Sequence, residues 1–247
     1  MIAFANQKGG VGKTTTAINL AACLAEAGER ALVVDLDPQA NATSGLGMRA
    51  NGTSTYDLLD GAPLSELAKP TAFANLFLVP SKPELAGVAV ELSRRDDGER
   101  YLAEALASAR DTYAFVLLDC PPSLGPLTVN ALAAADRVIV PVQTEYYALE
   151  GLAQLVQSIE LVKARLNPKL GIAGVLLTMA DGRTKLSAEV EEEVRRHFGK
   201  LVFDAVIPRS VRLAEAPSHG LPVTHYDRRS RGAEAYWKVA MELVERS

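Results

Sequence analysis

The sequence predicts an α/β fold in which a doubly wound, mostly parallel sheet carries helices on both faces. Short β-branched runs alternate along the chain with segments whose apolar residues recur at helical spacing. The strand runs are continuously apolar, which is typical of a sheet buried on both faces. Because strands and helices take turns, helical crossovers should join parallel strands. With 247 residues, 48% of them hydrophobic, the chain 1–247 fits a single domain with a sizeable core.

The individual elements follow from these patterns. Seven runs should form strands: Ile2–Asn6, Ala31–Asp35, Leu76–Val79, Ala114–Asp119, Arg137–Pro141, Ile172–Thr178 and Leu201–Ala205. Four segments should form helices: Thr14–Ala27, Glu99–Asp111, Leu149–Leu166 and Leu186–His197. Gly45–Pro70 is rich in Gly, Ser, Thr and Pro, but hydrophobic residues recur through it. We expect it to be an excursion from the sheet rather than a linker.

Composition narrows the class of protein. The formal net charge is −4, which argues against a surface uniformly coated with positive charge for nucleic acid but leaves room for a local basic face. No apolar run approaches the ~18 residues that span a bilayer. Cys23 and Cys120 lie far apart without C-x-x-C spacing, and both fall in apolar segments, so we expect buried, unpaired thiols. The chain is expected to be cytoplasmic.

A glycine-rich loop, KGGVGKTT at residues 8–15, joins the first expected strand to the first expected helix. Phosphate-binding loops require this context, because glycines let the backbone approach a ligand and the helix N-terminus attracts anions. The common pattern is G-x-x-x-x-G-K-[ST], but here Gln7 takes the first glycine position and a second lysine, Lys8, follows it. Because the loop keeps its glycines and its place before a helix, its backbone should surround phosphates at Gly9, Gly10, Val11 and Gly12.

Side chains at the end of the loop have expected roles in the same site. Lys13 should reach the terminal phosphates, Thr14 should hold Mg²⁺ and Thr15 should lie near the α-phosphate. Guanine-binding domains usually carry N-K-x-D, and no such tetrapeptide occurs, so ATP is favoured over GTP.

Carboxylates at two strand ends should gather beside this loop, because ligands of open parallel sheets bind at the carboxyl ends of strands. Asp119 follows four apolar residues in FVLLDCPPS, which fits a Walker B aspartate that holds Mg²⁺. Asp37, in VVDLDPQ, could contribute to the metal site and position the attacking water. For Asp35, a capping role at the strand end is as well supported as a functional one.

At this point the sequence resembles a known family. KGGVGKTT, DLDPQANATSGLG, DCPPS, PVQTEYYALEGL and IPRSVRLAEAPSHGLPV occur in this order across nearly the whole chain. Together they resemble the ParA/Soj-type chromosome or plasmid partitioning ATPases, which belong with MinD-type proteins to the deviant Walker A group of P-loop NTPases. The resemblance implies an ATP-dependent homodimer, non-specific binding to double-stranded DNA, stimulation by a ParB/Spo0J-like centromere-binding protein, and association with the nucleoid.

The resemblance also implies roles for particular residues. Lys8 would reach across the dimer to the phosphates of the other subunit, like an arginine finger, which can contribute about 10³–10⁵ in rate. Thr178, Met179 and Pro208 would border the adenine. Basic residues of the C-terminal third would bind DNA phosphates, and Arg183, Arg209 and Arg212 are the best choices because their segments read as loops or helix starts.

Three alternatives are weighed against this assignment. A MinD-like, membrane-associated positioning ATPase should end in a basic amphipathic helix. The C-terminal segment EAYWKVAMELVERS instead mixes acidic and basic residues. We therefore expect this segment to dock on the core and expect no stable membrane association. An electron-transfer ATPase like the nitrogenase iron protein needs cysteines poised at a dimer interface, and Cys23 and Cys120 are not so placed. A binding module without hydrolysis differs from an enzyme in the role of Asp37, which a phosphate-release assay would test.

Overall fold

A seven-stranded sheet with the order β3-β4-β2-β5-β1-β6-β7 forms the centre of the molecule. The computed structural model describes residues 1–92, 94, 97–145 and 148–246. The strands are β1 (Ile2–Phe4), β2 (Ala31–Asp35), β3 (Lys69–Pro70), β4 (Leu76–Val79), β5 (Phe115–Asp119), β6 (Arg137–Gln143) and β7 (Gly171–Thr178). All neighbouring strands are parallel except the pair β3 and β4. The predicted doubly wound, mostly parallel sheet is confirmed.

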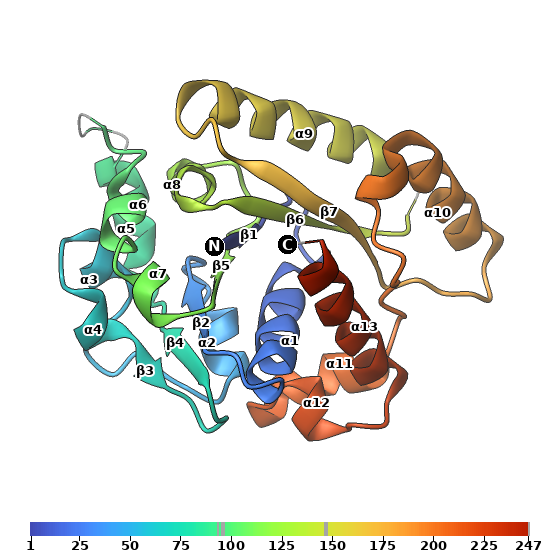
Figure 1. The fold of residues 1–247 in the computed structure, drawn as a ribbon, viewed down its shortest axis with the longest axis horizontal. Coiled ribbons are helices and arrows are strands. Elements are labelled where there is room, and N and C mark those ends of the chain that lie inside the picture. The colour runs from blue at the N-terminus through green and yellow to red at the C-terminus, as the bar shows by residue number, and fades with distance from the viewer. Residues whose placement is uncertain (93, 95–96, 146–147, 247) are drawn as a thin grey trace.

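Helices cover both faces of this sheet (Figure 1). The helices of the N-terminal half are α1 (Lys13–Glu26), α2 (Asn41–Gly45), α3 (Thr55–Leu59), α4 (Leu64–Leu67), α5 (Leu85–Leu92), α6 (Tyr101–Ala105) and α7 (Ala109–Thr112). Those of the C-terminal half are α8 (Pro126–Ala134), α9 (Ala148–Arg165), α10 (Lys185–Phe198), α11 (Val211–Glu215), α12 (Val223–Tyr226) and α13 (Arg231–Glu245), with short 3₁₀ turns at Gly199–Leu201 and Ala216–His219.

Alternate residues of the strands enter two separate hydrophobic cores, except in β3, whose two residues are exposed. In β1, Ile2 and Phe4 face the core that contains α1 and α13, whereas Ala3 faces the core that contains α8 and α9. Figure 1 shows these two helix layers on opposite sides of the sheet. Side chains of a strand point alternately to its two faces, so continuously apolar strands supply both cores at once.

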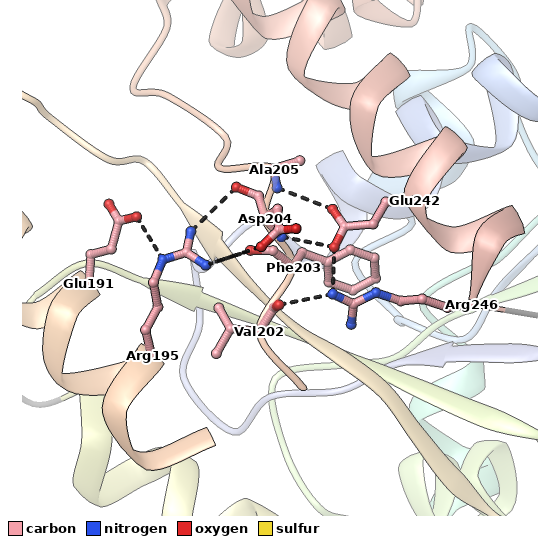
Figure 2. A network of polar contacts seen from close by, with 8 residues as sticks. All are labelled: Glu191, Arg195, Val202, Phe203, Asp204, Ala205, Glu242 and Arg246. Atoms are coloured by element: carbon pink, nitrogen blue, oxygen red, sulfur yellow. Dashed lines mark hydrogen bonds and ion pairs between the residues drawn. The ribbon is translucent and has the colours of Figure 1, made fainter. Parts of the chain in front are cut away.

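The predicted strand at Leu201–Ala205 is wrong. The segment begins in a 3₁₀ turn, and Val202 makes only an isolated bridge to Val175 of β7. Figure 2 shows the reason why no strand ladder extends from this segment: side chains of neighbouring helices form hydrogen bonds with its backbone amides and carbonyls. The amides of Asp204 and Ala205 donate to Glu242 of α13, and Arg195 of α10 donates to the Phe203 and Asp204 carbonyls.

The predicted helix at Glu99–Asp111 is interrupted, whereas the other three predicted helices are confirmed as α1, α9 and α10 with small shifts at their ends. Between α6 and α7 the amides of Ala107 and Ala109 donate to the carbonyls three residues earlier, a tighter turn than an α-helix allows. The sequence analysis did not identify α8, although Pro126 at its first position after Gly125 is a recognised start signal.

The two remaining segments agree with expectation. Gly45–Pro70 leaves the sheet, forms α3 and α4 and returns as β3. The C-terminal helix α13 docks on the core, where Tyr236, Val239 and Leu243 are buried. Within the described residues, no helix combines the length and apolar character needed to cross a bilayer.

Candidate functional site

The glycine-rich loop between β1 and α1 exposes backbone amides at the carboxyl end of the sheet. Gly10 and Gly12 have φ angles of +74° and +89°, in the left-handed region that side chains rarely adopt. Gly12 ends the loop directly before α1, and no side chain of the described residues caps this helix. The first amides of α1 are therefore free for an anionic ligand, and the helix dipole adds to their positive potential.

Residues from distant parts of the sequence brace the loop. The Thr178 hydroxyl, at the end of β7, donates to the Val11 carbonyl at 2.9 Å. Asn6 accepts the Lys8 amide at 3.0 Å and donates to the Pro141 carbonyl at 2.7 Å. These hydrogen bonds hold the loop in one shape, which reduces the ordering cost when phosphate binds.

Lys13 lies buried inside the loop. Its ammonium donates to the Lys8 carbonyl at 3.2 Å. Burial lowers its pKa, and the negative charges of Asp119 and Asp37 oppose that shift. A buried cation beside acidic groups is well placed to bind the terminal phosphates of a nucleotide.

Asp119 ends β5 with its carboxylate fully buried, next to Asp35 of β2 in the strand register. Neither carboxylate oxygen has a hydrogen-bond partner among the described residues. Burial raises the pKa of Asp119 well above its ordinary value, and the charge of Asp35 adds to the shift. The nearby Thr14 hydroxyl lowers this pKa, although it does not complete a hydrogen bond to the carboxylate. An unpaired buried carboxylate is costly, and a cation bound beside it would offset that cost.

Asp35 differs from Asp119 because its oxygens are occupied. One accepts the Asp37 amide at 3.1 Å, and the other accepts the Thr43 amide at 2.9 Å and the Thr43 hydroxyl at 2.7 Å. Burial raises the pKa of Asp35 to about 6, against which these hydrogen bonds act. Asp35 therefore fixes the segment between β2 and α2, which is the capping role rather than the functional one.

Asp37 lies at the rim of a cavity of about 400 Å³ that the phosphate loop encloses with neighbouring segments. One of its oxygens accepts the Gln39 amide at 3.0 Å. The cavity is lined by Gly9, Gly10, Gly12, Lys13, Thr14, Thr15, Ile18, Asn19, Asp37, Gln39, Asn41, Ser44, Pro122, Met179, Pro217 and Leu221. The structure thus brings the loop residues and Asp37 to one space.

A second cavity of about 190 Å³ shares Gly12, Thr15 and Met179 with the first. Thr178 and Pro208, the other residues expected at the adenine, also line it. Met179 adopts a left-handed φ of +52°, where the chain leaves β7. The mainly apolar lining suits a flat heterocycle, so the arrangement provides adjoining spaces for phosphates and for a base.

Lys8 does not line either cavity. Its ammonium forms an ion pair with Glu145 at 2.7 Å, and both side chains are about half exposed. Gln143, the last residue of β6, donates to the other oxygen of Glu145 at 2.6 Å. Tyr146 and Tyr147 of the quoted PVQTEYYALEGL motif lie outside the described residues.

The three expected DNA-binding arginines occupy two places. Arg183 pairs with Asp181 at 2.7 Å, and the Arg209 amide donates to the neighbouring Ala180 carbonyl at 3.0 Å, so these two arginines share one region. Arg212, at the start of α11, instead pairs with two carboxylates: Glu215 at 3.0 Å and Asp227 at 3.3 Å.

Residues that the sequence analysis did not single out connect α1 to the C-terminal helices. Asn19 donates to the Thr15 carbonyl at 2.7 Å and accepts the Val223 amide at 2.6 Å. Thr16 and Tyr236 share a hydrogen bond of 3.2 Å. The available signal was a polar side chain inside the apolar run AINLAAC, because a buried polar residue needs a partner.

Comparison with known proteins identifies the family. The model of a family described as an AAA domain matches residues 1–172. The chromosome-partitioning ATPase Soj of Treponema pallidum is 52% identical over 99% of this chain and 97% of its own length. The Soj protein of Thermus thermophilus is 56% identical, over 99% of this chain and 95% of its own length. The chain belongs to the Soj/ParA family of chromosome-partitioning ATPases.

Solved structures place this Soj/ParA-family chain among P-loop NTPases. Cobyrinic acid a,c-diamide synthase from Mycobacterium smegmatis, crystallised with ADP and magnesium, superposes with a TM-score of 0.86 at 38% identity, covering 99% of this chain and 93% of that one. MinD from Pyrococcus horikoshii, crystallised with Mg-ADP, has a TM-score of 0.82 at 28% identity, with coverage of 98% and 94%. These neighbours confirm the fold class, and the Soj relatives are the more similar proteins in sequence.

Proposed function

We propose that this chain is a Mg-ATP-driven dimerisation switch whose ATP-bound dimer binds DNA without sequence preference and separates after hydrolysis. The observation that carries the proposal is Asp119, a fully buried carboxylate beside Lys13 that has no hydrogen-bond partner in the described chain. Such a group costs stability unless a ligand uses it. Two similar solved structures contain ADP and magnesium, which supports a magnesium-bound nucleotide as the ligand of this chain.

The site fits a magnesium ion that is shared with phosphates. Within the described residues, no group of three or more His, Cys, Asp or Glu side chains could hold a metal alone. Magnesium usually binds proteins through one or two carboxylates together with substrate phosphates. Asp119 and the Thr14 hydroxyl would hold the ion, with Asp37 at the rim. When bound, it would neutralise negative charge on the terminal phosphates.

The residues of this chain divide the remaining work. The amides of Gly9–Gly12 and the Lys13 ammonium would bind and orient the phosphates, and Thr15 would lie near the α-phosphate. Thr178, Met179 and Pro208 would enclose adenine. Asp37, which stands at the cavity rim with one oxygen bonded to the Gln39 amide, would position the attacking water.

Lys8 would act in trans. Within the single chain its ammonium pairs with Glu145 at the surface and does not line the nucleotide cavity. Its charge is therefore available to a second copy of this chain. In a face-to-face homodimer it would reach the phosphates of the partner subunit, which ties ATP occupancy to dimerisation. We expect slow hydrolysis by the protein alone, accelerated by a ParB/Spo0J-like centromere-binding partner.

The output of the switch would be non-specific binding to double-stranded DNA. This binding would associate the protein, which we expect in the cytoplasm, with the nucleoid. The three expected arginines, Arg183, Arg209 and Arg212, are exposed and lie in the C-terminal third. The similarity to a chromosome-partitioning ATPase supports DNA as their ligand. Contacts between arginines and phosphates would supply affinity without reading bases.

The deciding experiment measures binding to a random-sequence DNA duplex with ATP, ADP or no nucleotide. The Asp37→Ala variant would hold the ATP state, and a salt series would accompany each state. We expect binding only with ATP, with an affinity that falls steeply as salt rises. Equal binding in all three nucleotide states would contradict the switch.

Absence of DNA binding in every state would remove the DNA output and bring forward the MinD-like alternative, tested with anionic liposomes. The charge of α13 and its C-cap does not favour that alternative, because Glu234, Glu242 and Glu245 balance Arg231, Lys238 and Arg246. Its apolar face is also already buried against the core. A helix that binds anionic lipid should be basic on its exposed face.

A further inference from the structure

Asp181 holds the exposed arginine next to it through three hydrogen bonds. The Arg183 side chain donates to both carboxylate oxygens, from Nε at 2.9 Å and from Nη2 at 2.7 Å. The Arg183 amide donates to the same carboxylate at 3.1 Å. This planar, two-point arrangement is the geometry with which a guanidinium also binds a phosphate. Both acids, carboxylate and phosphate, would therefore use the same donors.

The pair lies at the surface, where DNA could displace it. The Arg183 side chain is 86% exposed, while that of Asp181 is 22% exposed and belongs to the loop between β7 and α10. Hydrogen bonds from Arg183 lower the pKa of Asp181, and the charges of Arg183 and Arg209 add to that shift, so the carboxylate remains ionised beside Arg183. A negative charge thus lies within the basic region itself.

We propose that Asp181 competes with DNA phosphates for Arg183 and so keeps DNA binding weak and readily reversible. The inference rests on the proposed DNA-binding function and deepens it. Each phosphate contact of Arg183 requires the guanidinium to leave Asp181, so the loss of this ion pair offsets part of the affinity that the contact gives. Asp181 acts through Arg183, as a positioning residue, and has no contact with DNA of its own.

The matched variant is Asp181→Asn, which keeps an oxygen to accept the Arg183 amide while it removes the charge. Exposed ion pairs contribute little, so we expect DNA affinity in the ATP state to increase roughly twofold to fivefold. The freed arginine should also make the salt dependence steeper, by up to about one unit in the slope of log K against log salt. Unchanged ATP binding would establish that the variant is folded.

Two controls separate the competition from other effects of charge. Glu66→Gln makes the same charge change on α4, which Figure 1 places at the opposite side of the molecule from α10. It should leave DNA affinity nearly unchanged. Adding Asp181→Asn to an Arg183→Gln background should have no effect, because the residue for which Asp181 competes is then missing.

The outcomes distinguish the two proposals. If the wild type binds DNA in the ATP state and Asp181→Asn binds equally or more weakly, competition by Asp181 is wrong and the DNA switch stands. A gain of equal size in the Arg183→Gln background would also overturn the inference, because the carboxylate would then act without Arg183. If neither protein binds DNA, the proposed function fails first, and the inference fails with it.

Discussion

Lys8 and Lys13 lie five residues apart in one loop, yet their side chains have opposite surroundings. Lys13 is buried among the groups that would hold phosphate, and burial lowers its pKa. Lys8 points away from that cavity to an exposed ion pair with Glu145. One lysine therefore serves the nucleotide of its own chain, while the other has a replaceable surface partner and can serve a second chain.

The variant Lys8→Ala tests this division. ATP binding should remain within a few-fold of the wild type, because the Lys13 side chain and the loop amides are unchanged. ATP-dependent dimerisation should be lost, since the charge that reaches the partner subunit is gone. Equilibrium ATP binding and light scattering with ATP measure the two properties. Complete dimerisation of the variant with ATP would show that Lys8 does not act in trans.

Asp37→Ala tests the position of the attacking water. The backbone amides and Lys13 that would hold phosphate do not depend on this side chain, so the variant should bind ATP, dimerise and accumulate on DNA. Phosphate release should fall by about 10²-fold or more, the range for loss of a group that positions or activates a nucleophile. Wild-type rates of phosphate release would move this role to another residue.

At the scale of elements, β7 and the segment that follows α10 are packed without a gap. A Cβ at Gly174 of β7 would lie 2.5 Å from the Phe203 ring and 2.9 Å from the Leu201 carbonyl. The Phe203 ring is fully buried, and Arg246 stacks on it at 4.4 Å, so it has little freedom to move. Figure 2 shows this ring within the polar network.

The substitution Gly174→Ala should therefore lower the free energy of unfolding by about 1–3 kcal/mol through overpacking. Gly151→Ala is the matched control, because a Cβ there meets no atom within 4 Å on the exposed face of α9. That change should stabilise the protein by about 0.5–1 kcal/mol, the difference between Gly and Ala in a helix. Urea unfolding measures both. A harmless Gly174→Ala would mean that the Phe203 segment can shift away.

Elements that depend on local pattern were predictable, and those that depend on distant side chains were not. The phosphate loop and Asp119 follow from short motifs at strand ends, where the fold itself determines their position. The strand expected at Leu201–Ala205 failed because Glu242, about 40 residues later, takes its amides. Likewise, the pairs of Lys8 with Glu145 and of Arg212 with Asp227 were not predictable, since such ion pairs depend on which segments meet in space.

At the scale of the whole molecule, the nucleotide site stores unfavourable charge. Asp35 has a pKa of about 6 against an ordinary 3.8, and the pKa of Asp119 is also raised. Between the unfolded and folded pKa values, the folded state binds more protons than the unfolded state. The stability of the nucleotide-free protein should therefore fall as pH rises from about 4 to beyond 6, through Asp35 and Asp119 together.

Asp119→Asn should relieve part of this cost. We expect a higher unfolding temperature at pH 7 without nucleotide, a weaker dependence on pH, and loss of the extra stabilisation that Mg-ATP gives the wild type. Asp57→Asn is the control with the opposite sign, because hydrogen bonds from Ser54 and the charge of Lys82 lower the pKa of Asp57. A lower unfolding temperature for Asp119→Asn at pH 7 would contradict the account.

The bracing of the phosphate loop has a consequence for protein synthesis. Three hydrogen bonds support the loop and the helix α1 that follows it, and they join residues 167, 204 and 220 positions apart: Val11 with Thr178, Asn19 with Val223, and Thr16 with Tyr236. The motif leaves the ribosome before the helix α13 that supports it. A nascent chain can therefore carry the whole loop sequence and still lack its shape until α13 has emerged. Competence to bind nucleotide would then arise only after α13 has been synthesised, long after the motif itself.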